Sequence, residues 1–319
     1  MHEFQIINKY FLKLSNNNKS SLNLSDDVFF DKSKKLVVSV DTYVEGVHFI
    51  NFENPELVIK KIIRSSISDL ICKGVKPKYY FISGSGNNKS FSSSNLKKIS
   101  KSLKQEQMKY NIYLCGGDTV FSNKLSFTIT SLGFSKEIIY RNCAKLNDDI
   151  YVTGNLGESF TGLKILKKKI NVNNYLKKYF VNKYYLPNLH LKLTNKLFSF
   201  ANTSIDISDG LISDLEKLIN KQRLSYKLNL DNIPISKNLK KLLYQKKLNK
   251  ISYVSQGDDY QILFTANCSK SRIINKTAKS LGIKISKIGK ICSNQQKSQI
   301  IDQKGKKIAL KEKGYYHKF

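Results

Sequence analysis

The chain has 319 residues, a length that predicts about two domains, and its apolar fraction of 40% is enough for globular cores. No apolar run approaches the roughly 20 residues that a bilayer span needs, and Met1–Phe4 does not begin the apolar stretch of a signal peptide. We therefore expect a cytoplasmic protein that is neither exported nor inserted into a membrane.

The balance of charge is strongly basic, because 55 Lys and Arg stand against 24 Asp and Glu, a formal net charge of +31. Such a balance is typical of nucleic-acid-binding proteins, which makes one a distant alternative. The lysines, however, are spread along the whole chain, and the only arginines are Arg64, Arg141, Arg223 and Arg272. This pattern indicates solvated helix faces, and we expect no specific nucleic-acid partner.

The five cysteines are widely spaced and form no CxxC pair, and the four histidines form no HxxH or HExxH pattern. This usage favours reduced thiols over a disulfide framework, and it gives no support to a zinc site.

Apolar periodicity predicts the elements of the first half in chain order. They are a helix over residues 4–14, a strand over 36–44, a helix from Pro55 to a stop at Gly74, a strand over 79–82, a helix over 95–109, a short buried strand over 112–114 that ends in Gly116-Gly117-Asp118, and a strand over 125–134. A polar turn at 145–149 follows. We place the domain boundary there, between residues 1–147 and 148–319.

The second half begins with a predicted strand over 150–153 and a helix that runs through Leu166. A helical Tyr- and Lys-rich stretch follows, then residues 205–209 before a helix over 211–219, and strands near 226–230, 260–264 and 284–288. Because strands and helices alternate in both halves, we expect two α/β or α+β domains.

Acidic residues are few in this chain, and most of them stand at the edges of apolar segments. They are Asp26, Asp27, Asp41, Asp69, Asp118, Asp206, Asp209, Asp258 and Asp259. Carboxylates that converge on one cleft repel one another unless cations neutralise them, and Mg²⁺ prefers such hard oxygen ligands. Each acid alone also has a structural interpretation, for example Asp209 as the N-cap of the helix that follows it. Only the whole set predicts a magnesium-nucleotide site.

Two glycine-containing segments are candidates for binding phosphate. Residues 84–90 resemble a phosphate-binding loop but lack its Gly-Lys pair, so we interpret them as a flexible loop. Gly116-Gly117-Asp118-Thr119 is the better candidate, because glycines let backbone N–H groups approach phosphate while Asp118 binds a metal. A hairpin turn is the alternative interpretation of this segment.

Taken in order, these motifs resemble those of the thiamine-monophosphate kinase family, which shares a superfamily with aminoimidazole ribonucleotide synthetase, selenophosphate synthetase and the hydrogenase maturation factor HypE. The resemblance extends from Glu3-Phe4 to Gly314–His317. It rests on Ser25-Asp26-Asp27, Ser39–Thr42, Glu45–Phe49, Ser68-Asp69-Leu70, Gly116–Thr119, Tyr151–Gly154, Ile205–Leu211 and Gly257–Tyr260.

The resemblance implies a two-domain PurM-like fold and the ATP-dependent phosphorylation of thiamine monophosphate to thiamine diphosphate by direct transfer. It implies a homodimer formed through the N-terminal domains. Several Mg²⁺ ions would be held by Asp27, Ser39, the Val40 carbonyl, Asp41, Asp69, Asp118, Asp206 and Asp209. ATP would contact Tyr110, Gly117, Asp118, Arg141 and Ser208, and the thiamine phosphate would contact His48, Asp258 and Tyr315.

The chain departs from the family pattern at a few positions. Asn23-Leu24-Ser25 replaces the usual Gly-x-Gly, Val40 stands where Thr is common, and Asp258 stands where Glu is usual. Lys318 is an extra residue before Phe319. None of these changes removes a predicted metal carboxylate. The nearest alternative function is another ATP-using enzyme of the superfamily with a different acceptor.

Overall fold

The computed structural model describes residues 3–310 and 313–315, so the predicted family residues Tyr316 and His317, as well as Lys318, lie outside the described residues. The N-terminal segment is helical, but it is not the single helix predicted over 4–14. It divides into α1 (Glu3–Ile6), a π-helical turn (Ile7–Phe11) and a 3-10 turn (Leu12–Ser15), and a further 3-10 segment covers Lys19–Leu24. No residue of the two turns is buried, so no tertiary packing enforces a regular α-helix there.

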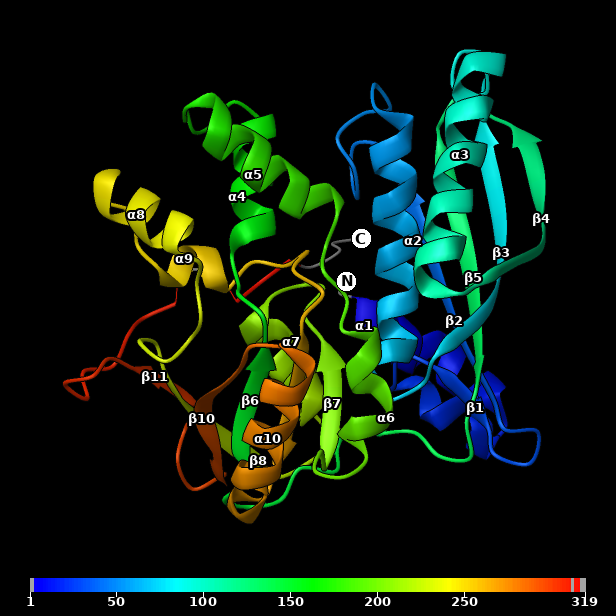
Figure 1. Cartoon of the computed structure of the whole chain (residues 1–319). Coiled ribbons are helices and arrows are strands. Elements are labelled where there is room, and N and C mark those ends of the chain that lie inside the picture. Colours follow the sequence, from blue (N-terminus) through cyan, green and yellow to red (C-terminus); the bar gives the residue numbers. More distant parts are fainter. Residues whose placement is uncertain (1–2, 311–312, 316–319) are drawn as a thin grey trace.

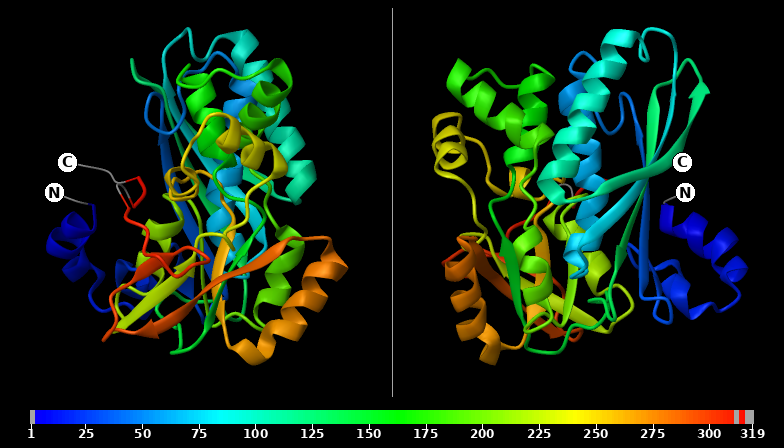
Figure 2. Two further views of the ribbon diagram at one scale, coloured as in Figure 1. Left: turned by 90° about the vertical axis from the view of Figure 1, so that its left-hand side faces the viewer. Right: turned by 45° about the vertical axis from the view of Figure 1, so that its right-hand side comes forward.

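The first sheet has five strands in the order β1-β2-β5-β3-β4. These are β1 (Phe29–Asp31), β2 (Leu36–Val44), β5 (Ser126–Phe134), β3 (Pro77–Gly86) and β4 (Tyr113–Phe121). All neighbouring strands are antiparallel except β3 and β4, which are parallel. Helices α2 (Pro55–Cys72) and α3 (Ser93–Tyr110) cover one face of this sheet (Figure 2, right).

Strands β3 and β4 differ from their predictions. Gly84 and Gly86, which we expected in a flexible loop, lie in β3, and Gly116-Gly117-Asp118 lies inside β4 rather than in a turn. The parallel ladder pairs Gly84 with Thr119, and it supplies backbone partners that the local sequence does not reveal. The predicted burial of residues 112–114 holds for Ile112 but is wrong for Tyr113 and Leu114, because every residue of β4 is exposed.

The second sheet has six strands in the order β11-β8-β10-β6-β9-β7. They are β11 (Gln299–Ile301), β8 (Leu224–Asn229), β10 (Ile285–Ser293), β6 (Asp149–Thr153), β9 (Ile262–Ala266) and β7 (Thr203–Asp206). The helices of this half are α4 (Glu158–Leu166), α5 (Asn174–Tyr185), α6 (Thr194–Leu197), α7 (Leu211–Leu218), α8 (Lys237–Gln245), α9 (Ile251–Val254) and α10 (Ser271–Leu281). Two mixed sheets with helices confirm the expected α/β (α+β) class.

Helix α2 lies between the two sheets (Figure 1). Pro55 occupies its first turn, and its apolar residues are buried both against the first sheet and against the second half. One hydrophobic cluster accordingly contains Val58 of α2, Ile129 of β5 and Phe264 of β9. The first sheet ends at residue 134 and the second begins at 149, and we propose 147/148 as the domain boundary.

None of the helices within residues 3–310 and 313–315 is both long enough and apolar enough to cross a bilayer.

Candidate active site

A cavity of about 630 Å³ lies where the two halves meet. In the first half its walls come from the segments before β1, from β2 and the residues after it, from α2 and from Arg141. In the second half they come from α4, from Lys217 of α7, from the loops over 206–209 and 256–260, and from Tyr315. The residues singled out from the sequence that line it are Asp27, Val40, Asp41, His48, Asp69, Arg141, Asp206, Ser208, Asp209, Asp258 and Tyr315. Folding therefore brings most of the predicted site residues into one place.

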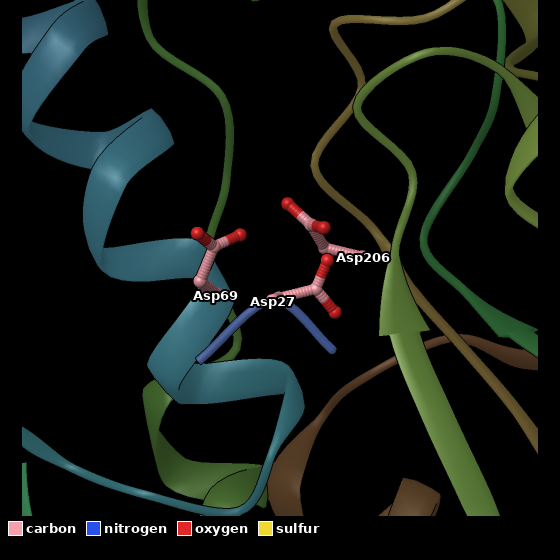
Figure 3. Close-up of side chains that lie close together, drawn as sticks. All are labelled: Asp27, Asp69 and Asp206. Atoms are coloured by element: carbon pink, nitrogen blue, oxygen red, sulfur yellow. The ribbon is translucent and has the colours of Figure 1, made fainter. Parts of the chain in front are cut away.

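Three aspartates form the centre of this cavity. Asp27 precedes β1, Asp69 lies in the last turns of α2, and Asp206 ends β7, so both halves of the chain contribute (Figure 3). Each offers a carboxylate oxygen, and the three oxygens lie within 4.8 Å of one another. Neighbouring hydroxyls orient them, because Ser39 Oγ donates to Asp69 at 2.5 Å and Ser68 Oγ donates to Asp206.

Two carboxylates of this cluster, Asp69 and Asp206, and the neighbouring Asp41 are difficult to ionise in the absence of a cation. Burial, followed by the repulsion of Asp41 and Asp206, raises the pKa of Asp69 well above its usual value. Burial also raises the pKa of Asp41 to about 7 and that of Asp206 to about 6. Neighbouring carboxylates that raise one another's pKa in this way favour binding of a multivalent cation.

The residues present fit a divalent cation such as Mg²⁺. Asp41 Oδ2 is buried and has no hydrogen-bond partner among the described residues, an arrangement that costs free energy unless a ligand satisfies it. The surrounding donors are carboxylate and hydroxyl oxygens, which are the ligands that Mg²⁺ prefers. We conclude that Asp27, Asp41, Asp69 and Asp206 form a site suited to this class of ion.

Basic side chains surround the cluster, and sequence reasoning identified only one of them. Arg141 forms an ion pair with Asp27, and its Nε lies 3.0 Å from Asp27 Oδ2. Lys73 is fully buried, and its Nζ lies 2.6 Å from Asp26 Oδ1 and 3.0 Å from Asp27 Oδ2. Lys73 could not be identified from the sequence, because nothing in a lysine-rich chain marks the one lysine that folds inward.

Asp209 does not cap helix α7, which was its alternative interpretation. The N-cap residue is Gly210, and no side chain caps the helix there; the buried carboxylate of Asp214 in the first turn instead accepts hydrogen bonds from the backbone N–H groups of Asp209 and Gly210 at 3.0 and 2.9 Å. The Asp209 carboxylate instead lines the cavity and pairs with Lys217. Asp214 and Lys217 are further residues that the sequence analysis missed.

Two loops of the second half are hydrogen-bonded to each other at the edge of the cavity. The backbone N–H of Asp258 donates to the Ser208 carbonyl, and that of Tyr260 donates to the Ile207 carbonyl, both at 2.8 Å. Gly257 permits this approach, because a Cβ at that position would collide with the Ser208 carbonyl. The C-terminal segment joins the same assembly, since Tyr315 N donates to the Asp209 carbonyl at 3.0 Å.

The three predicted substrate-side residues share this cavity. His48 Nδ1 accepts a hydrogen bond from Val44 N at 3.0 Å, and its ring lies edge-on to Tyr43. The Asp258 carboxylate forms an ion pair with Lys61, and Tyr315 is about half exposed.

Four of the predicted residues lie outside this cavity. Ser39 is buried behind Asp69, and Tyr110 ends α3 beside Arg64. Gly117 and Asp118 lie in the exposed strand β4, at the outer edge of the first sheet (Figure 1). The need for glycine at 117 has a local cause, because a Cβ there would collide with the Ile82 carbonyl of β3. The roles assigned to these four residues stay predictions.

Comparison with known proteins relates this geometry to a family. Residues 25–135 match the family model described as AIR synthase related protein, N-terminal domain. A protein named thiamine-monophosphate kinase from Buchnera aphidicola subsp. Acyrthosiphon pisum is 37% identical over 99% of this chain and 98% of its own length. The protein of the same name from Bacillus subtilis is 27% identical over 99% of both chains.

A solved structure has the same architecture over almost the whole chain. It is named "AaThiL complexed with AMPPCP and TMP", has a TM-score of 0.84 and 26% identity, and the match covers 99% of this chain and 97% of that one. Since a relative above 30% identity matches from end to end, the chain belongs to the thiamine-monophosphate kinase family.

Proposed function

We propose that this protein transfers the γ-phosphoryl group of ATP to thiamine monophosphate and forms thiamine diphosphate. One observation carries the proposal: the aspartate cluster and the three substrate-side residues line a single cavity between the two halves. The membership of the chain in the kinase family supports it, as does the neighbour described as complexed with AMPPCP and TMP.

The acceptor in this reaction is a phosphate oxygen that is already largely ionised, so the site needs no strong general base. The chain's residues then have to bring two anionic phosphates together in line and offset their charge. Arg141 and Lys217 both line the cavity and can bind phosphate oxygens. Bound at Asp27, Asp41, Asp69 and Asp206, Mg²⁺ would neutralise the charge that develops on the transferred group. Asp209 and Val40 also line this cavity, and we assign the Asp209 carboxylate and the Val40 carbonyl as further ligands.

The thiamine part of the acceptor carries a cationic thiazolium ring and a neutral pyrimidine. We assign Asp258 to the cation, and Tyr315 to stacking on one of the two rings. His48 lies in the same cavity, and because its Nδ1 accepts from Val44 N, its Nε2–H can donate to a polar atom of the acceptor. On the nucleotide side we assign Arg141 and Ser208, together with Gly117, Asp118 and Tyr110, as the family resemblance implies.

We further propose a homodimer that forms through the first sheet. Strand β4 is an edge strand and presents exposed Val120 and Phe121, and such an edge favours pairing with another chain. Asp118 lies on this strand, outside the cavity of its own chain. In the proposed dimer, Asp118 of one copy would therefore contribute to the cavity of the other copy. All five cysteines are free, which supports a cytoplasmic location.

Incubation of the purified protein with ATP, Mg²⁺ and thiamine monophosphate tests the proposal. We expect thiamine diphosphate and ADP in equal amounts, and no product when unphosphorylated thiamine replaces the monophosphate. If ATP is consumed only with a different acceptor, the protein is another enzyme of the superfamily. If no acceptor supports ATP turnover, the kinase proposal is wrong.

A further inference from the structure

Lys61 lies beneath the substrate-side wall of the cavity, and no motif of the sequence identified it. It belongs to α2 of the first half, and its side chain is only 1% exposed. Its Nζ lies 2.7 Å from Oδ1 of Asp258, which belongs to a loop of the second half. The hydroxyl of Tyr260 donates to the same oxygen at 3.1 Å. The Lys61 ammonium and the Tyr260 hydroxyl therefore both bind the same oxygen of the Asp258 carboxylate.

The second oxygen of this carboxylate is left for a ligand. Asp258 Oδ2 makes no hydrogen bond within the described residues, the side chain is 27% exposed, and the residue lines the cavity. Asp258 also has a backbone φ of 68°, a left-handed conformation that a loop adopts only when its surroundings hold it. The ion pair with Lys61 is one of the contacts that hold it.

Tyr184 of α5 connects this ion pair to the other substrate-side residue. The ring of Tyr184 lies 4.0 Å from Lys61 Nζ, and its backbone carbonyl accepts from the same ammonium at 3.4 Å. Its hydroxyl donates to the backbone carbonyl of His48 at 3.2 Å. Two buried side chains, one from each half of the molecule, thus support both Asp258 and His48 from behind.

We propose that Lys61 and Tyr184 are positioning residues that set the affinity for a cationic, phosphorylated heteroaromatic acceptor, Lys61 through Asp258 and Tyr184 through His48. This inference rests on the proposed function and deepens it. Asp258 is one methylene shorter than the Glu usual in the family, so its oxygen has little freedom to follow a displaced ligand. The position of its carboxylate is then decided by the ammonium beneath it.

Burial and charge support this division of roles. Burial lowers the pKa of the Lys61 ammonium below its usual value, and the Asp258 carboxylate counteracts that shift. A buried ammonium is tolerated only with such a partner, so the pair forms a unit that joins α2 to the loop over 256–260. Lys61 does not line the cavity itself, which excludes direct contact with the acceptor through the described surface.

Lys61→Met, which keeps an unbranched side chain one atom shorter and removes its charge, tests the first half of the proposal. We expect the KM for thiamine monophosphate to rise about tenfold, while the KM for ATP stays within about twofold of the wild-type value. Lys60→Met is the matched control, because Lys60 is the preceding residue of α2 and has no ion-pair partner within the described residues. We expect both constants to be unchanged in that control.

A double-mutant cycle shows whether Lys61 acts through Asp258. In an Asp258→Asn background, Lys61→Met should raise the acceptor KM by no more than about twofold further, because the partner through which it acts is already lost. Full additivity of the two changes would overturn the proposal, since it would assign Lys61 a general structural role. Melting temperatures of all four proteins show that folded enzymes are being compared.

Tyr184→Phe tests the second half with little risk to the fold, since it keeps the ring and removes one hydroxyl. We expect the KM for thiamine monophosphate to rise about threefold, while the KM for ATP stays unchanged. The control is Tyr185→Phe, whose hydroxyl makes no hydrogen bond within residues 3–310 and 313–315. Equal effects of the two variants, or a rise in the ATP KM instead, would overturn the assignment.

Absence of activity in the wild-type protein would contradict the proposed function itself, whereas an active wild type with an unchanged Lys61→Met variant contradicts only this inference.

Discussion

The aspartates at the centre of the cavity and Asp118 on β4 have equal support from sequence motifs, yet the structure gives them opposite surroundings. Asp69 and Asp206 lie together, with hydroxyl donors and a raised pKa. Asp118 is exposed on an edge strand, and its carboxylate accepts only a local hydrogen bond, from the Thr119 N–H, within the described residues. Burial and close neighbours therefore distinguish the cluster from Asp118, which in the proposed dimer would serve the site of a second molecule.

This contrast has an energetic consequence. Burying several carboxylates together destabilises the metal-free fold, and binding of the proposed cation would offset this cost. An exposed carboxylate such as Asp118 carries no such cost. Replacing residues of the two regions should therefore change stability and activity in different combinations.

The largest effect is expected from Asp69→Asn. The variant loses a central ligand, so kcat should fall by at least about 10³-fold. The same change relieves the repulsion with Asp41 and Asp206, and the melting temperature of the metal-free protein should stay equal or rise. Thermal denaturation with and without Mg²⁺ measures both parts. A metal-free variant that is less stable and keeps its Mg²⁺-induced stabilisation would contradict the interpretation of the cluster.

The next effect concerns the edge strand. Asp118→Asn and Asp69→Asn should each be inactive alone, but their co-expression should restore about a quarter of the wild-type activity, because half of the dimers are mixed and hold one intact site. Activity of the co-expressed mixture is the measurement, and the mixed dimer purified from it should show about half of the wild-type activity. If Asp118 served the cavity of its own chain, the mixed dimers would have no intact site and the activity would stay at background.

A moderate effect is expected from pH. The folded-state pKa values of Asp41 and Asp206 are raised to about 7 and about 6, so between pH 4 and 7 the folded protein binds protons that the unfolded chain releases. Stability of the metal-free protein therefore falls as pH rises through this window, and its melting temperature should be about 5 °C higher at pH 5.5 than at pH 7.5. Asp41→Asn should reduce the slope. A melting temperature that rises with pH would show that the buried acids do not dominate.

The smallest effect is expected from an exposed charge. Lys101 lies 3.4 Å from Glu56, and the two side chains are 63% and 37% exposed. Lys101→Ala should change the free energy of unfolding by about 0.5 kcal/mol or less, because water and salt screen such pairs. Chemical denaturation measures the change. A loss several times larger would remove the basis for contrasting exposed with buried charge in this molecule.

Much of the fold could be predicted, because local patterns coincide with tertiary packing in many elements. Strand β2 begins and ends at the predicted residues 36 and 44, and α2 starts at Pro55 as the position of that proline indicates. Strands β3 and β4 extend beyond the predictions, since their glycine-rich ends acquire regular structure only by pairing with each other. No local signal in a single segment reports such pairing.

The candidate site was predictable only in part, for a similar reason. The acidic residues are rare in this chain and stand out in the sequence, and the cavity contains most of them. Lys61, Lys73 and Lys217 belong to the commonest charged residue type of the chain, and only the fold shows that they point inward. Asp214 was missed because a helical carboxylate that binds the preceding loop looks, in the sequence, like any amphipathic helix residue.

The backbone bonds between residues 207–208 and 258–260 restrict how a protein of this design can evolve. Moving either segment by the length of one peptide would break two hydrogen bonds, and any side chain in place of Gly257 would collide with the Ser208 carbonyl. A lineage that retains its nucleotide chemistry and adopts a new acceptor must therefore exchange side chains at these positions and leave the chain path intact. Insertions and deletions that diversify substrate choice are accordingly expected elsewhere in the second half, where surface loops tolerate them.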